Sequence, residues 1–143
     1  MKWLNKTATS VMDRLTDGLV QPGDNKVFDA HGYTEKWDGG IMAVHVEHIG
    51  YAENQPDFPL FSVAHYYKQF GDMMRDPEMV FLRFPGNKYI PISYEQSGLG
   101  IYQTSVSFSS RDYSCVQFKS KMQADQASFA NTWMKNIREQ QNL

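Results

Sequence analysis

The residues that could do chemistry gather in one stretch, HYYKQFGDMMRDPEMVF, which covers residues 65–81. It contains one histidine and three carboxylates, at His65, Asp72, Asp76 and Glu78. An imidazole beside carboxylates can transfer protons, and crowding of like charges raises the pKa of one of them. If these four side chains meet, with or without a divalent metal, the chain is a hydrolase or a nuclease-like enzyme.

The same stretch also fits two turns. An Asp-Pro pair is typical of a turn start, because the aspartate accepts a backbone N–H and the proline fixes the next φ. Asp76-Pro77 and Gly71-Asp72 both suit this role. We therefore favour turn chemistry for the two aspartates, assign no catalytic residue, and expect that the four side chains mostly do not meet.

A second histidine-rich stretch, HVEH, begins at His45 and could bind a metal. Apolar and polar residues alternate here, which predicts a strand rather than a helix. On a strand His45 and Glu47 share one face, and His48 points to the other. We expect partly exposed histidines with no metal and no other cofactor, although His31 or His65 could add a ligand from elsewhere.

The remaining reactive side chains fit no catalytic motif. Cys115 is the only cysteine, so the chain has no intrachain disulfide, and its alternating context favours a small core residue. The serines of residues 105–110 lie in no G-x-S-x-G elbow. Gly98 and Gly100 lack the lysine of a phosphate loop and the full dinucleotide-binding pattern, which excludes nucleotide binding by those loops.

Tyrosines on the expected strands offer material for a binding surface. Aromatic rings on a sheet can stack nucleic-acid bases or contact a protein. The formal net charge is −2, from 14 basic and 16 acidic residues, which disfavours a nucleic-acid partner. We expect a protein partner or self-association, with the acidic residues facing a basic site on the partner. The expected contact residues are Tyr67, Asp72, Asp76, Glu78, Tyr94 and Tyr102.

Helices and strands must position these residues. Apolar residues at helical spacing predict a first helix between Leu4 and Leu19 and a long last helix between Met122 and Ile137. The segments between them alternate, and Pro91 indicates that its strand lies at a sheet edge. The expected strands cover residues 27–28, 41–49, 58–67, 79–84, 89–94, 101–108 and 113–118.

This order of elements predicts an α+β fold. We expect a mainly antiparallel sheet of about five or six strands, packed with an N-terminal and a C-terminal helix. A chain of 143 residues fits a single domain, residues 1–143. The sequence contains neither the apolar run of a signal peptide nor that of a membrane span, so we expect a cytoplasmic protein that does not contact a membrane.

Two blocks of the sequence resemble a small family of bacterial domains of unknown function. The first is a histidine-tyrosine strand, a Gly-Asp turn, and Met-x-Asp-Pro-Glu-Met at the start of the next strand. Phe70 departs from the pattern, which has a polar turn residue, commonly Asn, at this position. Matching positions are His65, Tyr66, Tyr67, Gly71, Asp72, Met74, Asp76, Pro77, Glu78 and Met79, then Pro91, Tyr94, Gln96, Gly100 and Gln103.

The resemblance implies a genetic context rather than an activity. Members of that family are carried largely on plasmids, phages and conjugative elements, which implies an accessory role such as countering host defence. Our first interpretation is a non-enzymatic interaction domain that binds a protein partner. The alternative is the metal-assisted hydrolase or nuclease-like enzyme built on residues 65–78, and the third is a nucleic-acid-binding module.

Overall fold

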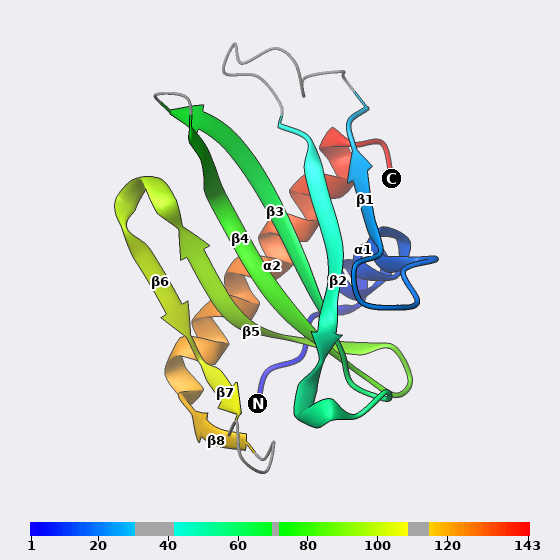
Figure 1. Ribbon diagram of the computed structural model, residues 1–143, viewed down its shortest axis with the longest axis vertical. Helices are drawn as coiled ribbons and strands as arrows, with labels where there is room; N and C mark the ends of the chain where they lie inside the picture. Colours follow the sequence, from blue (N-terminus) through cyan, green and yellow to red (C-terminus); the bar gives the residue numbers. More distant parts are fainter. Residues whose placement is uncertain (31–41, 70–71, 109–114) are drawn as a thin grey trace.

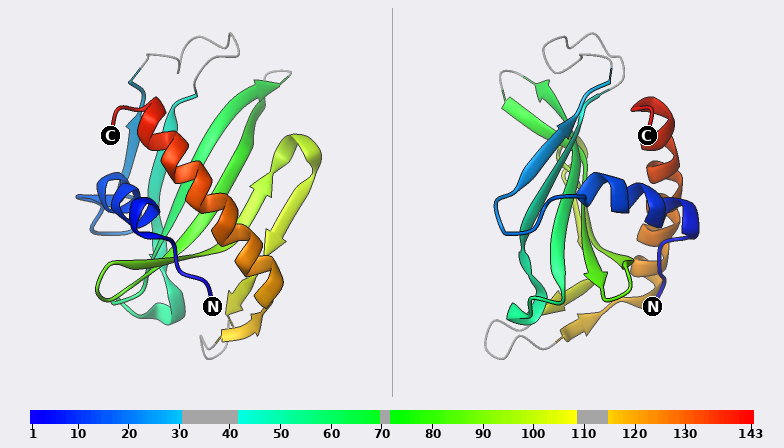
Figure 2. Two further views of the ribbon diagram at one scale, coloured as in Figure 1. Left: turned by 180° about the vertical axis from the view of Figure 1, so that it is seen from behind. Right: turned by 90° about the vertical axis from the view of Figure 1, so that its right-hand side faces the viewer.

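The computed structural model describes residues 1–30, 42–69, 72–108 and 115–143. Within these ranges, a sheet of six antiparallel strands in the order β1 to β6 carries two helices on one face (Figures 1 and 2). The predicted α+β fold is therefore confirmed. The main elements are α1 (Lys6–Thr16), β1 (Asn25–Phe28), β2 (Val44–Tyr51), β3 (Pro59–Gln69), β4 (Asp72–Phe84), β5 (Lys88–Gln96), β6 (Ile101–Thr104) and α2 (Ser120–Gln140).

Smaller elements connect these. The short helix η2 (Ala52–Asn54) links β2 to β3, and η3 (Ser97–Leu99) links β5 to β6. Strands β7 (Val106–Phe108) and β8 (Cys115–Phe118) pair with each other in a separate two-stranded sheet. The single stretch expected over residues 101–108 is therefore two strands, which belong to different sheets.

The first helix begins at a capping residue. Asn5 precedes it, and the side-chain oxygen of Asn5 accepts a hydrogen bond from the backbone N–H of Ala8, at 2.8 Å. This satisfies one of the N–H groups that a helix start leaves unpaired. The apolar stripe predicted from the sequence is buried, since Ala8, Val11 and Met12 are at most 1% exposed.

The last helix crosses the same face of the sheet and carries both apolar and amide side chains inward. Ala130, Met134 and Ile137 are fully buried in the main core. Gln123 and Gln126 are buried as well, and their amides bind the backbone of distant segments. The helix is thus fixed by apolar packing together with directional hydrogen bonds.

Two apolar clusters lie on opposite faces of the sheet. The main core packs β2 to β5 against the helices, with Phe61 and Phe81 at its centre. Leu60 and Leu82 pair across β3 and β4 and alternate with these phenylalanines, so they face the other way. They belong to a second cluster with Ile90, which covers one end of that face.

Two local predictions were wrong. Asp76 and Pro77 start no turn: they lie inside β4, at a bulge where two residues of β4 oppose one of β3. Pro91 does not mark an edge strand, because β5 lies between β4 and β6. Its missing N–H is tolerated because β6 pairs only with Ser93 to Gln96, and because Pro91 itself lies at a bulge against β4.

Candidate functional site

The register of the central strands separates the side chains of the two sheet faces. Val46 pairs with Val63, and both lie in the helix-side core. Glu47 pairs with Ser62, and these alternate with the core residues, so both point to the opposite face. We call the face opposite the helices the open face, because within the described residues no helix packs on it (Figure 2).

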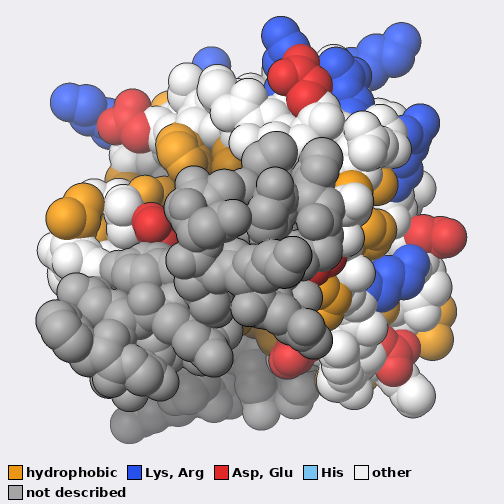
Figure 3. Space-filling view, turned by 90° about the horizontal axis from the view of Figure 1, so that it is seen from above, with side chains coloured by type: hydrophobic (Ala, Val, Ile, Leu, Met, Phe, Trp, Pro, Cys, Tyr) orange, Lys and Arg blue, Asp and Glu red, His pale blue; other side chains and the backbone are white. Residues whose placement is uncertain are grey.

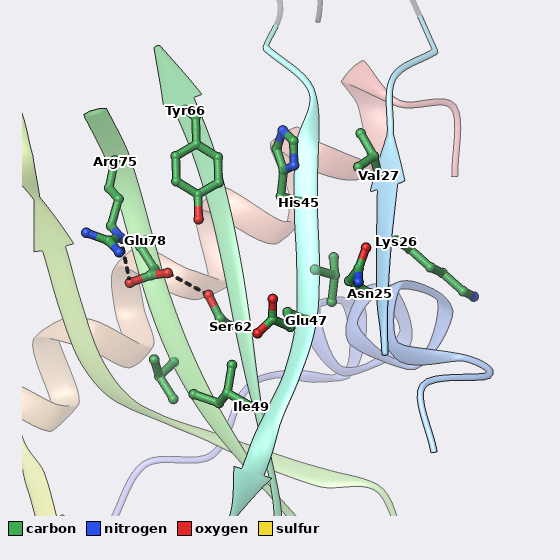
Figure 4. A pocket seen from close by; sticks show the side chains of 12 residues that line it. Asn25, Lys26, Val27, His45, Glu47, Ile49, Ser62, Tyr66, Arg75 and Glu78 are labelled. Atoms are coloured by element: carbon green, nitrogen blue, oxygen red, sulfur yellow. Dashed lines mark hydrogen bonds and ion pairs between the residues drawn. The ribbon is translucent and has the colours of Figure 1, made fainter. Parts of the chain in front are cut away.

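The open face contains a hollow of about 440 Å³ over β1 to β4 (Figure 4). Its floor is low at β3, because Ser62 there is a small residue and is 8% exposed. Larger side chains surround this floor. The lining residues are Asn25, Lys26, Val27, His45, Val46, Glu47, Ile49, Ser62, Tyr66, Arg75, Glu78 and Val80.

One carboxylate of the hollow is fixed from two sides. The hydroxyl of Ser62 donates a hydrogen bond to Glu78 Oε2 at 2.7 Å. On the other side, Nε of Arg75 lies 3.2 Å from Glu78 Oε1. A second arm of the Arg75 guanidinium lies 3.7 Å from Glu95 of β5. Charge-assisted contacts of this kind hold the Glu78 side chain in one orientation.

A second carboxylate, Glu47, is exposed at the hollow. Figure 4 shows its side chain directed toward Ser62 and the space in front of Glu78. Among the described residues, Glu47 makes neither a hydrogen bond nor an ion pair. The hollow therefore holds one compensated carboxylate and one without a partner.

An aromatic pair closes the upper side of the hollow. The rings of His45 and Tyr66 meet edge to face, with centroids 4.9 Å apart. Burial lowers the pKa of His45, and the nearby charge of Asp29 opposes this shift. Burial also raises the pKa of Tyr66 and the charge of Glu78 adds to the effect, whereas the charge of Arg75 and a hydrogen bond from it oppose the shift. Near pH 7 both rings are therefore uncharged.

The four residues of the enzyme hypothesis are not assembled in one cleft by the structure. His65 is 7% exposed and its ring packs on Trp133 of α2, at 5.4 Å, on the helix side. Glu78 pairs with Ala64 and points into the hollow on the open face. The side chain of Asp72 lies outside the described residues.

The fourth residue, Asp76, takes part in a chain of hydrogen bonds. Gln96 Nε2 donates to Asp76 Oδ1 at 2.9 Å, and the hydroxyl of Tyr94 donates to Gln96 Oε1 at 2.8 Å. The ring of Tyr94 packs on Phe129 of α2, with centroids 5.3 Å apart. Asp76 therefore belongs to the helix side of the sheet, apart from Glu78.

The expected contact residues also divide between the faces. Tyr94 faces α2, whereas Tyr102 pairs with Glu95 on the open face and is 68% exposed. Tyr89 is fully buried, and its hydroxyl lies between the side chains of Asp13 and Thr16. The tyrosines whose side chains the structure describes do not form one continuous surface. The side chain of Tyr67 and the residues His31, Phe70, Gly71 and Tyr113 lie outside the described part of the chain.

The histidines of the HVEH stretch divide as the strand pattern predicts. His45 and Glu47 line the hollow, whereas His48 is 1% exposed on the helix side, so the expectation of a partly exposed histidine is wrong for His48. Its Nδ1 accepts a hydrogen bond from the backbone N–H of Gly50, at 3.2 Å. In the described ranges, no three His, Cys, Asp or Glu side chains are grouped in a way that could hold a metal ion.

Sequence reasoning named Glu78 as a candidate but did not identify the other residues that fix it and shape the hollow. Ser62 and Arg75 carry no motif, and Glu47 was considered only as a metal ligand. The signal that could have found them is the face they share. Small residues on a central strand, flanked by carboxylates on both neighbouring strands, predict a polar depression once the register is known.

A family model matches the chain over most of this fold. The family model described as "Domain of unknown function (DUF6908)" matches residues 14–143. The chain belongs to this family. The expectation of a domain-of-unknown-function family is thereby confirmed. Neither a curated protein nor a solved structure matches the chain.

The DUF6908 match includes all six strands of the sheet and the whole of α2. It begins inside α1, yet the part of α1 before the match is equally well packed, with Ala8 and Met12 fully buried. The folded unit of this DUF6908 member therefore includes residues that precede the matched region. None of its helices, over the described ranges, is both long and apolar enough to cross a bilayer.

Proposed function

We propose that this DUF6908 chain is a non-enzymatic interaction domain that binds a protein partner through the open face of its sheet. The single observation that supports this is the hollow at the centre of that face. It combines a fixed carboxylate, Glu78, with a second carboxylate, Glu47, that has no partner among the described residues. Uncovered apolar side chains beside a concave group of polar side chains mark a surface that can bind a partner.

Apolar side chains lie at the rim of the hollow. Val27 of β1 is 51% exposed and Ile49 of β2 is 43% exposed, and both line it. Across the face, Tyr102 of β6 adds an exposed ring. Apolar and aromatic side chains contribute the area that stabilises a complex, and the polar centre confers specificity.

The charges of the surface fit a protein better than a nucleic acid. The hollow contains two glutamates and Arg75, whose charge is shared with Glu95. Figure 3 views another side of the molecule, where acidic and basic side chains are mixed over the described residues. A nucleic-acid site would instead require a continuous basic surface.

The resemblance described above supplies the context of the proposal. Roughly residues 60–103 resemble domains carried on plasmids, phages and conjugative elements, and this supports an accessory role for such an element. In this proposal the chain acts in the cytoplasm, by binding a host protein or a second copy of itself. Interference with host defence is one role that such binding would serve.

Affinity capture tests the proposal. The tagged chain is incubated with nuclease-treated bacterial lysate, and the retained proteins are compared with those retained by a Val27→Asp/Ile49→Asp variant. A charge on each rim residue would be desolvated in the complex, so we expect the variant to lose the specific partner. The partner found by mass spectrometry is then purified, and its affinity for both chains is measured directly.

A matched control separates loss of binding from loss of folding. Val20 is 75% exposed and follows α1, outside the open face, so Val20→Asp places one negative charge, half of the charge added by the rim variant, on another part of the surface. We expect Val20→Asp to retain the partner. Equal capture by the wild-type chain and the rim variant would exclude the open face. Light scattering on the purified chain tests self-association in the same preparations.

A further inference from the structure

The hollow presents three oxygen acceptors from two neighbouring strands. Glu47 and Ser62 are directly paired across β2 and β3, which puts their Cβ atoms about 5 Å apart. Figure 4 shows the carboxylate of Glu47, the hydroxyl of Ser62 and the hydroxyl of Tyr66 all directed into the same space. The proton of Ser62 is donated to Glu78, so the lone pairs of Ser62 remain available as acceptors.

The charge of the hollow favours a cation. Arg75 contacts Glu78 at 3.2 Å and Glu95 at 3.7 Å, so this one positive charge serves two carboxylates. Glu47 adds a negative charge that no cation among the described residues compensates. Lys26 borders the hollow, but in Figure 4 its side chain points away. A positively charged group in front of Glu47 and Ser62 would therefore be stabilised.

The number of acceptors distinguishes between cations. An ammonium group has three N–H donors, and Glu47, Ser62 and Tyr66 offer one acceptor side chain for each. A guanidinium group is a planar fork that can pair with both free oxygens of Glu47, but all its donors lie in one plane, so the two further acceptors, Ser62 and Tyr66, favour an ammonium group, whose three donors diverge. Glu78 offers neither cation a free oxygen, because one oxygen accepts from Ser62 and the other faces Arg75.

Apolar side chains lie beside these acceptors. Ile49 lines the lower side of the hollow in Figure 4 and Val27 the side formed by β1, and Val80 of β4 also lines it. The four methylene groups of a lysine side chain can lie along such a wall while the ammonium group reaches the acceptors. The aromatic pair of His45 and Tyr66 closes the opposite side.

We propose that the hollow binds the ammonium group of a lysine side chain of the protein partner, held by Glu47, Ser62 and Tyr66. This inference rests on the proposed function and specifies the partner's chemistry at the centre of the open face. Glu47 supplies the charge, Tyr66 and Ser62 complete the set of acceptors, and Arg75 with Glu78 keeps Ser62 in place.

Nuclear magnetic resonance on the isotope-labelled full chain tests this binding. The probe is Nα-acetyl-lysine-methylamide, compared at equal ionic strength with the same compound acetylated on its side chain and with the arginine analogue. We expect shifts on β2, β3 and β4 around the hollow, with millimolar affinity, because a single side chain is a small ligand. The acetylated compound should cause no such shifts, and the arginine analogue should bind more weakly than lysine.

Two substitutions assign the effect. Glu47→Gln keeps the size of the side chain and removes its charge, so we expect affinity for the lysine probe to fall about fivefold. Glu139→Gln, at an exposed position of α2, removes the same charge elsewhere and should leave the affinity unchanged. Both variants should retain the wild-type dispersion of amide signals, since neither position is buried.

Several results would overturn the inference. These are equal binding of the acetylated probe, binding of the arginine analogue at least as tight as that of lysine, or an unchanged affinity in Glu47→Gln. Preferential broadening of the hollow's signals by Mn²⁺ would assign it to a metal instead. These failures would leave the open face as a protein contact intact, provided that the Val27→Asp/Ile49→Asp variant still loses the captured partner.

Discussion

At the residue scale, the clearest feature is the different state of two glutamates that share one hollow. Glu78 is held by Ser62 and Arg75, whereas Glu47 has no hydrogen bond or ion pair within the described structure. A glutamate fixed from two sides has a structural role in keeping the floor of the hollow rigid. An exposed glutamate beside it is free to engage a ligand.

The first prediction concerns the Ser62 hydroxyl. Ser62→Ala removes a hydrogen bond to a charged acceptor in a nearly buried position, so we expect a loss of about 1.5 kcal/mol in the free energy of unfolding. Urea titration measures it. Ser93→Ala is the control, since Ser93 has the same 8% exposure as Ser62. Ser93 lies on β5, where it pairs with Val80 of β4. A loss as large for Ser93→Ala would contradict the role given to the Ser62–Glu78 contact.

The second prediction concerns His65. Its Nε2 is buried without a hydrogen-bond partner among the described residues, and burial lowers the pKa of His65 to about 4, with a further contribution from His45. Folding therefore favours the neutral ring, and the unfolded chain takes up the proton first as the pH falls. The contribution of His65 to the free energy of unfolding is therefore fully present above pH 6.5. Between pH 6.5 and 4 the free energy of unfolding falls by about 3 kcal/mol because of this residue.

His65→Phe tests this pH dependence. Phenylalanine keeps the edge contact with Trp133 and cannot be protonated, so we expect a flatter stability profile between pH 6.5 and 4. Burial also lowers the pKa of His45 and His48, so some slope should remain. Unfolding curves at several pH values measure it, and an unchanged slope in the variant would show that His65 titrates freely in the folded state.

At the element scale, α2 holds distant segments through its glutamines. Gln123 exchanges two hydrogen bonds with the backbone of Lys2, at 2.8 and 2.7 Å. Gln126 accepts from the hydroxyl of Ser105 at 2.6 Å and donates to the backbone of Gln103 at 3.1 Å. The helix thereby fixes the N-terminal segment and the connection between β6 and β7.

The third prediction follows from the second of these glutamines. Gln126→Ala leaves the buried Ser105 hydroxyl and the Gln103 carbonyl without this partner, so we expect a loss of about 2–3 kcal/mol in the free energy of unfolding. Asn136→Ala, at an exposed position of the same helix, should change stability by less than about 0.5 kcal/mol. Denaturant unfolding compares the two, and similar values would contradict the account of α2.

The elements themselves were largely predictable from the sequence. Helical spacing located both helices, and alternation located the strands, because burial of one face imposes these periods. The bulge at Asp76-Pro77 was not predictable, since Asp-Pro has the local chemistry of a turn and only pairing with β3 keeps it in the strand. The same holds for Pro91, which is tolerated in β5 because β6 pairs only with residues 93–96 of that strand.

At the scale of the whole molecule, the sheet divides the candidate residues between two environments. The motif residues His65 and Asp76 lie on the helix side, and Glu78 lies on the open face. Strand alternation alone could not show this, because the bulge in β4 shifts the register between the two halves of the motif. The hollow could not be predicted either, since it depends on which residues of four strands lie side by side.

The open face also explains why the fold has uncovered apolar side chains. The helices bury the other face almost completely, whereas Val27 and Ile49 remain about half exposed around the hollow. A partner that covers them would remove apolar area from water and stabilise the complex. The central claim is therefore that the chain contacts its partner with this face.

Site-specific photo-crosslinking tests this claim most directly. A photoreactive amino acid is placed at position 49 on the open face or, in a separate variant, at position 135 on the exposed side of α2, and both chains are irradiated in lysate. The account predicts that position 49 yields a cross-link to a distinct protein and that position 135 does not. Cross-linking of that protein from position 135, with none from position 49, would contradict it.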